Sequence, residues 1–194
     1  MISRFLLPLV LGATALSAQV TSERILNARQ EPQNWLTYSG DYNGQRHSPL
    51  TDINPENAKN LELQWVFQAR SLEKFEATSL VVDGIMYTTG SPGTVYALDA
   101  RSGKLRWETV AHDYKTGAQH STGPAAVQGK SRNVMVITGR SCPDARTTRS
   151  GCFIAAHDAR TGKEVWRFYT TAAPGEPGGD TWGGLEVSQR MASP

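Results

Sequence analysis

The sequence has only two cysteines and no basic run interleaved with aromatic residues. Its 20 Lys and Arg balance 18 Asp and Glu, for a formal net charge of +2, so nothing in the charge pattern points to a nucleic-acid partner. No C-x-x-C pair and no spaced histidine pair completes a metal site, which argues against a zinc-binding module. The four histidines are expected at the surface or in turns: His47, His112, His120 and His157.

One long apolar run is present, and it lies at the N-terminus. In "MISRFLLPLVLGATALSAQ", Arg4 precedes an apolar stretch from Phe5 to about Leu16, and small residues follow. This pattern is typical of a secretory signal peptide and is too short for a membrane span. We therefore expect residues 1–18 to be removed, which would leave a periplasmic or secreted chain without a membrane span. An N-terminal anchor that stays attached is the alternative.

The two cysteines, Cys142 and Cys152, lie close together in "RSCPDARTTRSGCF". In an oxidising compartment, a disulfide between them would stabilise the fold by roughly 2–3 kcal/mol through the entropy of the unfolded chain. Two free structural thiols are the alternative.

A repeat organises the rest of the chain. "YALDARSGKLRWE" and "IAAHDARTGKEVWRFY" share an Asp-Ala-Arg-Ser/Thr-Gly-Lys run followed by Trp107 or Trp166. Before the first copy, "TSLVVDGIMYTTG" predicts a β-hairpin closed by Asp83-Gly84. "PAAVQGKSRNVMVITG" predicts the matching hairpin before the second copy. With the hairpins of the repeats themselves, each unit contains four antiparallel strands, over about residues 78–110 and 124–170.

Four-stranded units that recur every roughly 40–50 residues are typical of β-propeller blades. The second unit is longer, and the polar stretch "GRSCPDARTTRSG" accounts for the extra residues. A blade buries its faces against copies of itself, so Trp107 and Trp166 are expected to be largely buried against adjacent blades. The fold class is therefore all-β, built of propeller blades.

The repeats "ALDARSGKLRW" and "AHDARTGKEVW" resemble the tryptophan docking motifs of the quinoprotein dehydrogenases, which use pyrroloquinoline quinone. "NWLTYSGDYNGQRHSPLTDINPENAKNLELQWVFQ" and "FEATSLVVDGIMYTTG" are similar to that family's mature N-terminus and first blade. The resemblance implies an extended segment over residues 19–60 and an incomplete ring of about two blades plus one strand over 61–194. It also implies that the chain is a fragment of a larger domain.

By the same resemblance, Glu76 and Thr122 would contact the quinone cofactor. The alternatives are a solvated carboxylate at a strand end for Glu76 and a turn-capping hydroxyl for Thr122. The family's vicinal cysteine pair is absent, and its "GAEYG" segment with a calcium-binding glutamate is replaced by the polar insertion. The family's catalytic aspartate comes from a later blade. We therefore assign no catalytic residue and no metal ligand to this chain.

The resemblance implies an exported oxidoreductase that transfers hydride from an alcohol to pyrroloquinoline quinone. The complete protein would use Ca²⁺ and pass electrons to a cytochrome or another periplasmic acceptor. The 194 residues by themselves are expected to be inactive, so whether this chain is an enzyme stays open. The alternative is a non-catalytic propeller that binds protein partners in the cell envelope.

Overall fold

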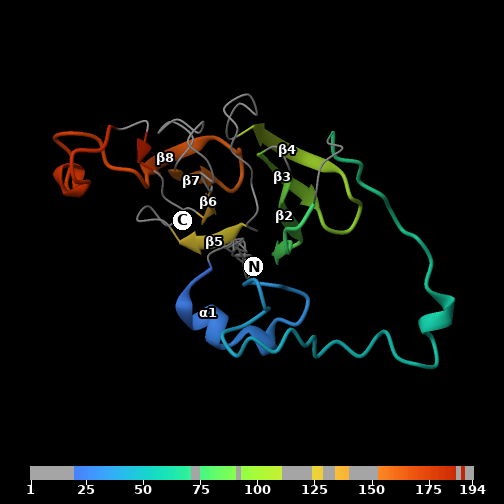
Figure 1. The fold of residues 1–194 in the computed structure, drawn as a ribbon. Coiled ribbons are helices and arrows are strands. Elements are labelled where there is room, and N and C mark those ends of the chain that lie inside the picture. Colours follow the sequence, from blue (N-terminus) through green and yellow to red (C-terminus); the bar gives the residue numbers. More distant parts are fainter. Residues whose placement is uncertain are drawn as a thin grey trace, which may run out of the picture.

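A computed structural model describes residues 20–70, 75–90, 93–110, 124–128, 134–139, 153–186 and 189–190. It confirms the all-β architecture, with two four-stranded antiparallel sheets side by side (Figure 1). The first sheet has the order β1 (Leu80–Val82), β2 (Ile85–Gly90), β3 (Thr94–Asp99), β4 (Leu105–Val110). The second has the order β5 (Ala125–Gln128), β6 (Val134–Gly139), β7 (Phe153–Asp158), β8 (Glu164–Tyr169). Within the described residues, no helix has the length and apolarity needed to cross a membrane.

The hairpin turns follow from their sequences. Asp83 and Gly84 connect β1 to β2 with φ angles of 50° and 78°, and these positive values are the reason for the Asp-Gly pair. In the turn between β3 and β4, the Gly103 amide donates to the Asp99 carbonyl at 2.8 Å. The turn between β7 and β8 repeats this bond from Gly162 to Asp158 at 2.8 Å. The two copies of the sequence repeat are therefore two copies of one turn.

The aspartate side chain closes each of these turns. In the first copy, the Asp99 carboxylate accepts hydrogen bonds from the Ser102 amide at 3.0 Å and the Ser102 hydroxyl at 2.9 Å. Together with the ion pair to Arg106 at 2.8 Å, these contacts lower the pKa of Asp99 to about 2. Asp158 accepts the equivalent bonds from Thr161, so serine and threonine are interchangeable here.

The core lies between the two sheets. Val95 and Ala97 of β3 are fully buried, and they belong to one cluster with Val136 of β6 and Ala159 after β7. Tyr87 of β2 joins this cluster, and its hydroxyl donates to the Ala159 carbonyl at 3.3 Å. Burial raises the pKa of Tyr87 to about 12. The second sheet therefore covers one face of the first sheet.

Trp107 connects the sheets at their border. Its indole Nε1 donates to the Ala159 carbonyl at 2.9 Å, and its ring lies on the backbone of Gly162. A Cβ added to Gly162 would lie 2.6 Å from Trp107 Cε3, closer than real carbon contacts come. The glycine of the repeat is therefore required twice, for its positive φ of 72° and for the ring against it.

Trp65 occupies the same kind of site on the first sheet, which the sequence analysis did not anticipate. Residues 61–69, called the strap here, are extended, and a Cβ on Gly103 would lie 2.6 Å from Trp65 Cδ2. Phe67 of the strap meets Tyr96 of β3 edge to face, with ring centroids 5.2 Å apart. The sequence "LELQWVF" contains the tryptophan and its apolar neighbours, but no Asp-Ala-Arg-Ser/Thr-Gly-Lys run precedes it.

The expectation that both repeat tryptophans are largely buried is wrong for Trp166, and Trp107 is partly buried. The pairing of Trp166 with Ala156 matches that of Trp107 with Ala97, yet Trp166 is 38% exposed. The reason is that no sheet lies on this face of the second sheet in the described part of the chain. Register alone does not bury a side chain.

The N-terminal segment packs against the first sheet. Trp35 pairs with Val81 through two backbone hydrogen bonds of 2.8 and 3.0 Å, which covers part of the free edge of β1. Val20 and Leu36 are buried in the core between the sheets. Helix α1 (Ser22–Leu26) lies between them in sequence, and the Thr21 hydroxyl caps it by accepting from the Arg24 amide at 3.1 Å. Short 3₁₀ turns occur at Ala28–Gln30, Ala58–Asn60 and Gly179–Thr181.

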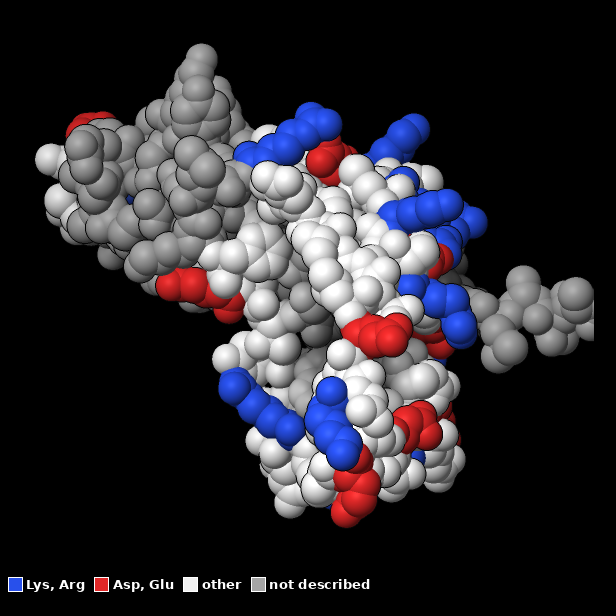
Figure 2. Space-filling model, turned by 90° about the vertical axis from the view of Figure 1, so that its right-hand side faces the viewer, with Lys and Arg blue, Asp and Glu red and all other residues white. Residues whose placement is uncertain are grey.

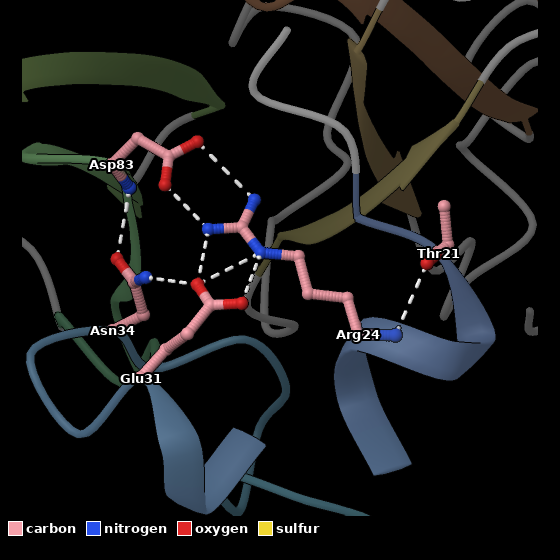
Figure 3. Close-up of polar contacts among 5 residues, drawn as sticks. All are labelled: Thr21, Arg24, Glu31, Asn34 and Asp83. Carbon is pink, nitrogen blue, oxygen red and sulfur yellow. Dashed lines mark hydrogen bonds and ion pairs between the residues drawn. The ribbon is translucent and has the colours of Figure 1, made fainter. Parts of the chain in front are cut away.

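A closed polar network fixes this segment to the turn between β1 and β2 (Figure 3). The Arg24 guanidinium donates to the Glu31 carboxylate from Nε at 2.9 Å and to the Asp83 carboxylate from Nη1 at 3.2 Å. The Asn34 side chain donates to Glu31 at 2.8 Å and accepts from the Asp83 amide at 2.9 Å. Arg24 is 15% exposed, so its contacts are partly shielded from water.

We expect Arg24→Met to lower the free energy of unfolding by about 1–3 kcal/mol, because two carboxylates lose a charged donor. Arg24 holds the pKa of Glu31 below its ordinary value. The folded protein therefore gains stability from this pair above the unfolded pKa of glutamate and loses it as pH falls between about 5 and 3. Denaturant titrations of both proteins across this range measure the effect.

Arg29→Met is the matched control, because Arg29 bonds only an exposed glutamine, Gln45, in the described contacts. It should change the stability by less than about 0.5 kcal/mol. Equal acid sensitivity in the Arg24→Met variant and the unmodified protein would show that the network does not carry the pH dependence.

Candidate functional site

The two ends of the first sheet differ. The turns after β1 and β3 lie at one end, where Arg24 of α1 reaches Asp83 (Figure 3). Because β1 is antiparallel to β2, the residues before β1 lie at the other end, beside the last residue of β2. Glu76 is among them. The end with Glu76 is therefore opposite the N-terminal segment.

Glu76 is exposed in the extended residues that lead into β1. The residue before it, Phe75, is fixed by a close contact. A Cβ added to Gly90 at the end of β2 would lie 2.8 Å from Phe75 Cε2 and 3.1 Å from Tyr96 Cε2, so the aromatic ring rests directly on the glycine. Sequence reasoning singled out Glu76 but missed this support from Phe75 and Gly90.

The structure does not test the other predicted site residues. Thr122, Cys142 and Cys152 lie outside the described residues. The connection from Gly139 to Phe153 contains both cysteines and joins β6 to β7, as Gly90 to Thr94 joins β2 to β3. The β6–β7 connection therefore begins and ends at one end of the second sheet. That end corresponds to the end of the first sheet where Glu76 lies.

Metal ligands are not clustered in the part of the chain that the structure describes. No group of three or more His, Cys, Asp or Glu residues there could hold a metal ion. Figure 2 shows Lys and Arg interspersed with Asp and Glu over one face of the molecule, rather than gathered by sign. Of the two residues predicted to contact the cofactor, Glu76 and Thr122, the described part of the chain contains Glu76.

His157 is not at the surface or in a turn, as the sequence analysis expected. It lies on β7 with no exposed area, and burial lowers the pKa of its imidazole. Its counterpart in the first sheet is Leu98, since Leu98 pairs with Met86 as His157 pairs with Val136. A neutral histidine thus fills a position that an apolar side chain fills in the other sheet.

Residues 35–131 match the family model described as "Glucose/ethanol/alcohol dehydrogenase, beta-propeller domain". The chain is 33% identical to the quinohemoprotein alcohol dehydrogenase ADH-IIG of Pseudomonas putida, over 85% of this chain and 29% of that protein. It is 38% identical to the 1-butanol dehydrogenase (cytochrome c) of Thauera butanivorans, over 74% of this chain and 20% of that protein.

Solved structures give the same result. The quinohemoprotein alcohol dehydrogenase ADHIIG from Pseudomonas putida superposes with a TM-score of 0.54 at 30% identity, over 84% of this chain and 31% of that one. The Comamonas testosteroni enzyme superposes with a TM-score of 0.54 at 28% identity, over 85% and 31%. The chain spans less than a third of the length of these relatives, and it belongs to the glucose/ethanol/alcohol dehydrogenase beta-propeller family of quinoprotein dehydrogenases.

Proposed function

We propose that this chain forms part of an exported quinoprotein oxidoreductase that oxidises alcohols with pyrroloquinoline quinone and passes the electrons to a cytochrome or another periplasmic acceptor. The match of residues 35–131 to the dehydrogenase propeller domain is the main support. The relatives' names supply the substrate class and the type of acceptor. The proposal includes a signal peptide at 1–18, an N-terminal segment at 19–60 and a propeller portion at 61–194.

The position of Glu76 fits a cofactor ligand. When bound, pyrroloquinoline quinone supplies an ortho-quinone that accepts a hydride from the alcohol carbon. The exposed Glu76 carboxylate can accept hydrogen bonds from a polar planar group, and the packing of Phe75 on Gly90 restricts where that carboxylate can lie. We propose Thr122 as a second contact on the strength of the resemblance.

Calcium is proposed for the complete enzyme without a ligand from the described residues, since they contain no metal-binding cluster. The described part of the chain also has no assigned catalytic base. The support for the proposal that the 194 residues alone do not turn over substrate is their coverage of only 29% of the length of the Pseudomonas putida relative.

The test is reconstitution of the protein expressed from its complete gene with pyrroloquinoline quinone and Ca²⁺, followed by dye reduction with a primary alcohol. Glu76→Gln keeps the side-chain shape and removes the charge. It should weaken cofactor retention about tenfold to a hundredfold, as expected for a lost hydrogen bond to a charged group, with unchanged thermal unfolding of the apoprotein. Equilibrium dialysis against the quinone measures the retention.

Glu56→Gln is the control, because Glu56 is an exposed carboxylate on the segment before the sheets and should leave retention unchanged. If Glu76→Gln retains the quinone as well as the unmodified protein, the assignment of Glu76 is wrong. If the folded protein binds no quinone with any metal, the non-catalytic scaffold becomes the better function.

A disulfide between Cys142 and Cys152 belongs to the same proposal, because export would place both thiols in an oxidising compartment. Peptide mass spectrometry of unreduced protein from the periplasm should find the two cysteines in one linked pair. Two thiols that alkylate without reduction would refute both the pairing and its use as a sign of export.

A further inference from the structure

His157 is a buried titratable side chain that the proposed function does not use. It has no exposed area, and neither of its ring nitrogens has a hydrogen-bond partner among the described residues. Buried polar groups in proteins are nearly always paired, so an imidazole without a partner is unusual. Its counterpart in the first sheet, Leu98, is also buried, which shows that an apolar side chain can fill this position.

The side chain of His157 lies on the face of the second sheet that meets the first sheet. His157 pairs directly with Val136, and paired residues of antiparallel strands lie on the same face of their sheet. Val136 belongs to the core cluster that Tyr87 of the first sheet also joins. Both sheets of this contact lie within the described residues. The histidine is therefore part of the contact between two neighbouring sheets.

His157 also lies at the base of the turn that receives Trp107. The turn begins with the next residue, Asp158, whose carbonyl accepts from the Gly162 amide at 2.8 Å. The Gly162 backbone lies beside the imidazole, and its carbonyl accepts from the Thr109 hydroxyl of the first sheet at 2.7 Å. A change in the charge of the imidazole would therefore act where the first sheet is attached to the second.

Burial is the largest influence on the pKa of His157 and lowers it. Two charged side chains of β8 act in opposite directions, since Glu164 raises this pKa and Arg167 lowers it. Tyr87 is the titratable group of the first sheet at this contact among the described residues, and burial raises its pKa to about 12, so it stays neutral. The Asp158 carboxylate is held by hydrogen bonds within its own turn. The remaining described side chains on the facing sides of β3, β4 and β6 are uncharged: Val95, Ala97, Trp107, Thr109, Val136 and Thr138.

We propose that His157 makes the contact between the two sheets sensitive to mild acid, and that its protonation loosens the docking of Trp107 on Gly162. A buried imidazolium is costly, because it loses its hydration and gains no compensating bond. The unfolded chain binds this proton near the ordinary histidine pKa of about 6.5, whereas the folded protein binds it only at lower pH. The stability of the contact is therefore complete at neutral pH and is lost as the pH falls below about 6.5. The histidine lies at the end of the sheets opposite Glu76, and the proposal does not depend on the quinone site.

Backbone hydrogen exchange of the protein expressed from its complete gene tests this proposal. The equilibrium constant for opening of β4, β7 and β8, corrected for the intrinsic exchange rate at each pH, should rise in mild acid by up to about tenfold per pH unit below about 6.5. His157→Leu, which copies Leu98 of the first sheet, should remove this rise. His157→Gln is neutral at every pH and should do the same, even if leucine fits the position badly. His47→Gln is the control, because His47 is exposed on the N-terminal segment, and it should keep the full rise.

The imidazole itself can be titrated in the unmodified protein. Deuterium exchange at its C2 carbon, followed by mass spectrometry over a series of pH values, should give His157 a pKa below the ordinary value of about 6.5. A pKa at or above that value would mean that Glu164 or the Gly162 backbone compensates the charge, and it would overturn the proposal. Acid-induced opening that persists unchanged in both His157 variants would overturn it as well, because other groups would then carry the pH dependence.

Discussion

Trp107→Ala is expected to lower the free energy of unfolding by about 3–5 kcal/mol, because the partly buried ring packs against the core and its removal leaves a cavity. Trp107 joins the two sheets by its indole hydrogen bond to Ala159 at 2.9 Å and by its ring on Gly162. It also meets Tyr87, with ring centroids 6.1 Å apart. Its removal leaves a cavity at the border of both sheets, and denaturant titration of the variant measures the loss.

Trp166→Ala is the matched control, with the same residue type at the same register. Because Trp166 is 38% exposed and lacks a receiving turn in the described chain, its loss should cost under about 1.5 kcal/mol. Equal losses at the two positions would mean that register, rather than the contact with Gly162, decides the contribution.

Gly162→Ala is expected to destabilise by about 2–5 kcal/mol through two separate effects. The φ of 72° costs a residue with a Cβ about 1–2 kcal/mol. The new methyl group would also lie 2.6 Å from Trp107 Cε3 and from the Thr109 hydroxyl oxygen, and such overpacking costs about 1–3 kcal/mol. Thr109 donates a 2.7 Å hydrogen bond to the Gly162 carbonyl, so it has little freedom to move away.

Gly175→Ala separates the two effects. Gly175 has a φ of 81° but no atom within 4 Å of an added Cβ, so only the backbone cost should appear. In a double-mutant cycle, Gly162→Ala should cost less in the Trp107→Ala background, because the ring that the methyl group meets is gone. Additive losses would mean that the Trp107 ring does not contribute and that the cost comes from the backbone and from Thr109.

Sequence reasoning was strongest for the sheets. Asp83-Gly84 and the turns at Asp99 and Asp158 require particular backbone angles, and the apolar residues between them alternate as strands do. These signals lie within a few consecutive residues. The eight strands, their order and the equivalence of Trp107 with Trp166 could therefore be predicted before any tertiary contact was known.

The candidate site was only partly accessible from the sequence. The resemblance of "FEATSLVVDG" picked out Glu76, but the support of Phe75 by Gly90 depends on a residue on another strand. Trp65 was missed because it is not preceded by the Asp-Ala-Arg-Ser/Thr-Gly-Lys run that marked the other two tryptophans. His157 was placed wrongly because its burial comes from side chains outside its own strand.

The sequence by itself determined where strands and turns form, because backbone preferences and period-two alternation are properties of neighbouring residues. The tertiary structure decided which equivalent residues are covered: Trp107 lies between two sheets, while Trp166 faces solvent. It also decided that Arg24 binds Asp83, 59 positions away. Burial and ion pairing depend on surfaces brought together from distant parts of the chain, and no local pattern specifies which surfaces will meet.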